Sequence, residues 1–78
     1  MTREHWETEL RRWIWQEPFR PFVVELKSGE RVLAVDPDAV GFGGGNAGII
    51  QPGGIPVSFR ITDIIRIEAS DAATAHAS

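Results

Sequence analysis

The first part of the chain carries its large apolar side chains three or four positions apart, at Trp6, Leu10, Trp13 and Ile14. This spacing places them on one face of an α-helix. Thr2 precedes the stripe and is a suitable N-cap, because its hydroxyl can accept a hydrogen bond from a free N–H group of the first turn. Pro18 disfavours a helical conformation in Glu17. The pattern therefore predicts an amphipathic helix over residues 3–16.

Trp15 does not belong to this stripe. Successive residues of a helix are about 100° apart, so Trp15 points away from the face that carries Trp13. Two interpretations are open. As a single exposed apolar residue it rests at the rim of the domain near the helix end, which is the interpretation we favour. As an interface anchor it belongs to a binding site, since Trp is over-represented at binding hot spots.

Residues 18–22 read Pro-Phe-Arg-Pro-Phe and predict an extended connector after the helix. The two prolines fix φ and remove two main-chain donors, so the helix cannot continue here. The two phenylalanines are interpreted as core anchors. Arg20 lies between them and is expected to project into solvent.

A period of two replaces the helical spacing after the connector. Residues 22–27 and 30–36 predict a β-hairpin with a two-residue Ser-Gly loop. This loop pairs Lys27 with Glu30, so that opposite charges meet across the strands. The same register places five apolar residues on one face, namely Phe22, Val24, Leu26, Leu33 and Val35.

Four shorter strands are predicted in the remainder, at residues 39–43, 47–51, 55–61 and 64–69. They are separated by segments rich in Gly, Pro and Asp, which favour turns. In the third of these strands, Val57, Phe59 and Ile61 share one face. Pro56 near its start indicates an edge position or a bulge, because proline cannot donate to a ladder.

These elements predict a single domain over residues 1–69, followed by a small, polar and disordered tail at residues 70–78. A length of 78 residues allows one domain. The predicted fold class is α+β and mainly β. An N-terminal amphipathic helix precedes a five- to six-stranded antiparallel meander or a small SH3-like or Sm-like barrel.

The order of motifs is similar to that of a group of small uncharacterised bacterial proteins. A helix with Trp is followed by Pro-Phe-Arg-Pro-Phe, by Asp36-Pro37, and by the closing segment Arg-Ile-Thr-Asp-Ile-Ile-Arg-Ile-Glu at residues 60–68. The order of elements over residues 6–69 also resembles Sm-like and other SH3-like small barrels. The Sm-like resemblance implies homo-oligomeric rings and RNA binding.

The chain departs from the Sm-like pattern where that family binds RNA. Sm-like proteins carry an Asp and an Asn near the end of their third-strand region, whereas here Asp36 and Asp38 flank Pro37. Thr62-Asp63 replaces the basic residue and glycine that typically precede the last strand. We therefore carry over no RNA-binding residue.

The chain has no cysteine, and its two histidines, His5 and His76, lie near opposite ends. These counts exclude a disulfide framework and a structural zinc site, which takes about four Cys or His ligands. Absence of cysteine favours a reducing compartment, and the charged N-terminal residues lack the apolar core of a secretory signal. We therefore expect a cytoplasmic protein with no membrane span, no metal and no cofactor.

Candidate catalytic chemistry is sparse. Three glycines match the letters of the dinucleotide fingerprint G-x-G-x-x-G, namely Gly43, Gly45 and Gly48. An apolar pair and a turn follow them, whereas the fingerprint needs a helix that holds the pyrophosphate. Asp36, Asp38 and Asp63 adjoin predicted turns, where carboxylates act as caps. No reactive nucleophile stands beside a base, so we expect no enzymatic activity.

One group of residues is a candidate interaction surface, and we call it the helix-end surface: Arg11, Arg12, Trp15 and Arg20. Arg and Trp side chains together can stack on bases or bind an acidic protein surface. They can equally be a solvated helix end whose basic residues complement the helix dipole, which is the interpretation we favour.

The overall charge weighs on the choice of function. Eight basic and 11 acidic residues give a net charge of −3, which opposes non-specific binding to nucleic acid. A short chain without disulfides or metal gains stability from a partner. The leading hypothesis is therefore a non-enzymatic interaction module that forms a homo-oligomer. The alternative is an Sm-like protein that binds single-stranded RNA.

Overall fold

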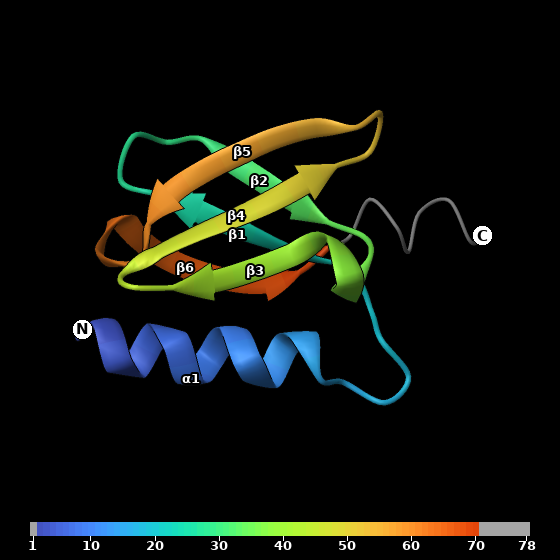
Figure 1. Cartoon of the computed structure of the whole chain (residues 1–78), viewed down its shortest axis with the longest axis horizontal. Coiled ribbons are helices and arrows are strands. Elements are labelled where there is room, and N and C mark those ends of the chain that lie inside the picture. Colours follow the sequence, from blue (N-terminus) through green and yellow to red (C-terminus); the bar gives the residue numbers. More distant parts are fainter. Residues whose placement is uncertain (1, 71–78) are drawn as a thin grey trace.

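The computed structural model describes residues 2–70, which form one α-helix and six β-strands (Figure 1). The elements follow one another as α1 (Arg3–Ile14), β1 (Phe22–Leu26), β2 (Arg31–Ala34), β3 (Val40–Gly43), β4 (Asn46–Gln51), β5 (Ile55–Arg60) and β6 (Ile64–Ala69). Two 3₁₀ turns, η1 (Pro37–Ala39) and η2 (Ile61–Asp63), precede β3 and β6. This confirms the predicted α+β class with antiparallel strands.

The helix begins as predicted and ends two residues early. Thr2 is its N-cap, and the Thr2 hydroxyl accepts a hydrogen bond from the His5 N–H at 3.2 Å. The Gln16 side-chain amide donates to the carbonyl oxygens of Trp13, at 2.7 Å, and Arg20, at 3.0 Å. Gln16 therefore belongs to the connector, which it ties to the last turn. No helix among residues 2–70 has the length and apolar character needed to cross a membrane.

The strands form two three-stranded antiparallel sheets, β2-β1-β6 and β3-β4-β5. The inner faces of both sheets and the apolar face of α1 enclose one core. In Figure 1 the helix runs below β3 and β6, along the long axis of the molecule. The buried core residues are Trp6, Leu10, Phe22, Val24, Leu26, Val32, Ala34, Ala47, Ile49, Phe59, Ile61 and Ile64.

The predicted register of the first hairpin is wrong by one residue. Its loop has three residues, 27–29, because Gly29 adopts a φ of 91° and the Leu26 N–H donates to the Glu30 carbonyl at 2.9 Å. A loop of this length ends in a left-handed glycine that forms a bulge. The shift turns β2 over, since neighbouring strand residues face opposite sides.

The one-residue shift in register changes which residues of β2 reach the core. Val32 and Ala34 are buried opposite Val24 and Phe22, whereas Leu33 is half-buried and Val35 is 41% exposed. The charge pairing that suggested the other register also exists in this one, where Arg31 is the partner of Glu25. Charge complementarity therefore did not distinguish the two registers.

The second sheet follows the prediction more closely. Gly44 and Gly45, with φ of 62° and 86°, form a two-residue turn between β3 and β4, as such tight hairpins require. β5 is an edge strand, as Pro56 indicated. Ser70, predicted to begin the disordered tail, is buried, and its N–H donates to the Pro21 carbonyl at 3.1 Å. The prediction for 71–78 lies outside the described residues.

Candidate interaction surfaces

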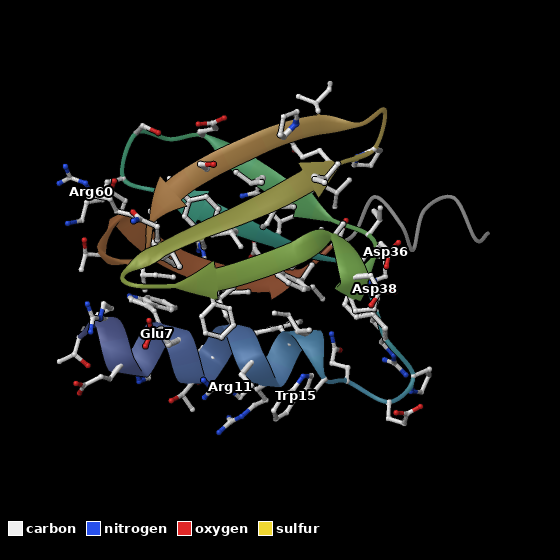
Figure 2. The ribbon with its side chains drawn as sticks, viewed as in Figure 1. Glu7, Arg11, Trp15, Asp36, Asp38 and Arg60 are labelled. Carbon is white, nitrogen blue, oxygen red and sulfur yellow. The ribbon has the colours of Figure 1, made fainter. Side chains whose placement is uncertain are left out.

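The structure joins two members of the helix-end surface, Arg11 and Trp15, on the last turns of α1 (Figure 2). The Arg11 guanidinium lies 5.9 Å from the centre of the Trp15 ring and 5.5 Å from that of Phe42. Both distances are within the range of cation–π attraction. Trp15 is nevertheless 72% exposed, so much of its surface remains available to a partner.

The local sequence explains two of the three residues of this cluster, Arg11 and Trp15. Arg11 and Trp15 are four residues apart, and residues at this spacing are neighbours on a helix surface. Phe42 comes from β3 and was not predicted as part of the site. Phe42 alternates with Val40 along β3 and both side chains pack against the core, but which element Phe42 meets depends on how α1 packs beneath β3.

The other two residues of the helix-end surface have different surroundings. The Arg12 guanidinium lies 3.8 Å from the Glu9 carboxylate and, with Glu9, Trp13 and Gln16, lines an open hollow of about 340 Å³. Arg20 is exposed, as predicted, and its carbonyl is held by Gln16. No hydrogen bond or ion pair connects Arg12 or Arg20 to Trp15 within residues 2–70.

A second exposed surface lies on the β3-β4-β5 sheet. Ile50 is 52% exposed, and its cross-strand partner is the exposed Pro56. Ile55, 57% exposed, precedes Pro56 at the start of β5. We call Ile50, Ile55 and Pro56 the β4–β5 patch. The sequence marked Pro56 as an edge residue but assigned no role to the two isoleucines, because their exposure depends on how β5 is covered.

The outer face of the β2-β1-β6 sheet carries, in contrast, a network of ion pairs. Glu25 accepts from Arg31 at 3.2 Å and from Arg66 at 2.8 Å, and Arg31 also reaches Glu68 at 2.9 Å. The hydrogen bond from Arg66 to Glu25 raises the pKa of the guanidinium, and the negative charges of Glu25 and Glu68 add to this effect. These charged side chains therefore already have partners within the chain.

The turn carboxylates act as caps where their contacts are defined. An Asp36 side-chain oxygen accepts from the Asp38 N–H at 2.9 Å and caps η1. Asp36 and Asp38 lie at the opposite end of the molecule from Arg60 (Figure 2). Within residues 2–70, no three His, Cys, Asp or Glu side chains gather as a metal site would require. The glycines of the G-x-G-x-x-G match lead into β4 rather than into a helix.

No protein-family model, no curated protein and no solved structure matches this chain. A function must therefore be argued from the chain's own two exposed surfaces, the helix-end surface and the β4–β5 patch.

Proposed function

We propose that this protein is a non-enzymatic interaction module that associates with further copies of itself. The β4–β5 patch is the observation that carries this proposal. Single exposed apolar residues are common on protein surfaces, but Ile50 and Pro56 are cross-strand partners on one face of the sheet, and the exposed Ile55 adjoins Pro56 at the start of β5. Adjacent exposed apolar residues of this kind are typical of interaction sites.

The size of the domain also supports self-association. A chain of 78 residues has a small core, and its stability margin is thin without disulfides or metal. Burial of the β4–β5 patch against a second copy adds apolar contacts that one chain cannot make alone. The cytoplasmic location predicted from the cysteine-free sequence is part of the same proposal.

Size-exclusion chromatography with light scattering tests the proposal across a concentration series. We expect wild-type protein to be larger than a monomer at high micromolar concentration. The variant I50K places a charge in the β4–β5 patch and should remain monomeric. I65K is the matched control, because Ile65 is 48% exposed on β6, outside the patch. A wild-type monomer at every concentration contradicts the proposal.

A second candidate function is the binding of single-stranded RNA by an Sm-like barrel. The pairing of β6 with β1 and the β3-β4-β5 meander support the comparison with Sm-like and SH3-like barrels. The specific observation in its favour is the exposed Trp15 ring beside Arg11, since aromatic rings stack on bases and arginine adds cation–π attraction. The net charge of −3 opposes it.

Fluorescence anisotropy with a labelled mixed-sequence RNA tests this second candidate. If it holds, binding is present at low salt, weakens steeply as salt rises, and is lost in both W15A and R11A. R60A is the control, because Arg60 lies well away from Trp15, above the N-terminal end of α1 (Figure 2). No binding of wild-type protein at low salt, or equal loss in R60A, rules out this surface.

A further inference from the structure

The main-chain N–H and C=O groups of β5 point alternately toward its partner strand β4 and toward its open outer edge. The Ile61 N–H donates to the Gly45 carbonyl at 2.9 Å, and this pair continues the register of β4 and β5. Hydrogen-bonded pairs alternate with non-bonded pairs in an antiparallel ladder. Val57 and Phe59 therefore bond to β4, whereas Pro56, Ser58 and Arg60 direct their main-chain groups to the outer edge.

Nothing in residues 2–70 pairs with that outer edge, because β5 ends the strand order of its sheet. β5 lies along the upper margin of Figure 1, away from α1. Unpaired strand edges are templates for pairing with another strand. Pro56 shortens the template, since it has no N–H to offer, and Ser58 and Arg60 keep theirs.

We propose that two copies of this chain pair antiparallel through β5, with a two-fold axis at Ser58. The inference rests on the self-association proposed above and names its interface. Ser58 exchanges both main-chain hydrogen bonds with Ser58 of the second copy. Each Arg60 N–H then donates to the carbonyl of Pro56 in the other copy. The missing N–H of Pro56 is the one defect in this ladder.

The side chains favour the same register. Pro56, Ser58 and Arg60 are exposed and share the outer face of β5. In the paired sheet Arg60 lies opposite Pro56 of the second copy, next to Ile50. The aliphatic part of an arginine covers apolar surface while its guanidinium stays in water. Arg60 has no ion-pair partner among residues 2–70, so it is free to take this position. A slip toward the carboxyl end of β5 leaves the β4–β5 patch uncovered.

β2, an edge strand of the other sheet, is a less suitable site for pairing with a second copy. The Leu26–Glu30 hydrogen bond sets the alternation in the first hairpin, which turns the Leu33 N–H outward. The Gln51 side-chain oxygen accepts this N–H at 3.0 Å. The chain therefore closes that position of β2 itself, and the corresponding donors of β5 stay open.

The size of the interface predicts a weak dimer. A stable interface covers about 800 Å² per partner, roughly a sixth of the 5023 Å² that this chain exposes. We expect one short strand with the β4–β5 patch to cover less than this. We therefore expect the dimer to dissociate on dilution in the micromolar range.

Single-cysteine variants test the register directly, since the natural chain has no cysteine. Residues of a hydrogen-bonded antiparallel pair have Cα atoms about 5.5 Å apart, which a disulfide can bridge. S58C places the two cysteines on the axis. R60C is the matched control, because it is exposed on the same strand and face but lies roughly 13 Å from its counterpart across the axis.

We expect S58C to form a disulfide-linked dimer at least about tenfold faster than R60C under a glutathione buffer, as followed on non-reducing gels. An equimolar mixture of P56C and R60C should cross-link to the heterodimer. Circular dichroism confirms that each variant is folded.

The possible results distinguish a failure of the proposed β5 interface from a failure of the self-association proposal. If light scattering shows a dimer and S58C cross-links no faster than R60C, the β5 interface is wrong and self-association stands. An assembly larger than two without the S58C preference points to a head-to-tail contact and also overturns the two-fold pairing. A strict monomer with equal, slow cross-linking of both variants removes both proposals.

Discussion

The three tryptophans of α1 and its cap occupy three different environments. Trp6 is buried, Trp13 packs its ring 5.6 Å from the Phe22 ring, and Trp15 is 72% exposed. Helical spacing alone predicted this order, because Trp15 lies off the stripe that carries the other two. The structure adds that the Trp15 ring is flanked by Arg11. At this scale, the same residue type serves the core at two positions and the surface at the third.

Truncating Leu10 and truncating Trp15 should therefore destabilise the fold to very different extents. Leu10 is fully buried, so L10A leaves a cavity and lowers the free energy of unfolding by about 2–5 kcal/mol. W15A removes a larger side chain but lowers it by less than about 0.5 kcal/mol, as surface changes usually do. Urea denaturation followed by circular dichroism measures both. A W15A loss as large as that of L10A means that Trp15 supports the fold.

At the scale of elements, the first hairpin shows how one backbone angle decides a strand's orientation. Lys27, Ser28 and Gly29 form its loop, and the φ of 91° at Gly29 adds the residue that shifts β2. The extra residue buries Val32 and Ala34 in place of Leu33 and Val35. The sequence is compatible with a loop of two residues and with a loop of three. The burial of side chains in the folded core decides between these two loop lengths.

A Gly-to-Ala change isolates the cost of that backbone angle. A Cβ at Gly29 meets nothing within 4 Å, so G29A is penalised by its left-handed conformation alone. We expect a loss of about 1 kcal/mol in the free energy of unfolding. G41A is the matched control, because Gly41 has equally open space and lies in β3 without a positive φ. It should be neutral or stabilising by up to about 1 kcal/mol. Equal effects in chemical denaturation contradict this account.

Element type, order and approximate bounds could be read from the sequence, because they depend on local spacing and on turn residues. The helix end at Ile14 could not, since Gln16 binds the carbonyls of Trp13 and Arg20 only after the connector has folded back. Within the candidate site, Arg11 and Trp15 were predictable as helix neighbours. Phe42 and the β4–β5 patch were not, because they depend on which elements meet and which strand is left at an edge.

Across the whole molecule, the two sheets present unlike outer faces. One carries the Arg31–Glu25–Arg66 ion pairs, which join all three of its strands. The other is mostly glycine and small residues and ends in the β4–β5 patch. Charged groups that are already paired within the chain resist desolvation by a partner, whereas exposed isoleucines gain from it. We therefore expect contact between copies to form on the second sheet.

The hydrogen bond from Leu33 to Gln51 has a consequence for how far assembly can proceed. A domain with two equivalent open edges can add copies at both and grow into a fibril. Here the Gln51 side-chain oxygen accepts the outward Leu33 N–H, so β2 has one donor fewer to offer an incoming strand. The pairing proposed above would occupy the β5 edge on both copies, so a further copy could not add at that strand. Replacing Gln51 with a residue that has no side-chain acceptor would leave the Leu33 N–H open to an incoming strand, and we expect such a variant to aggregate more readily.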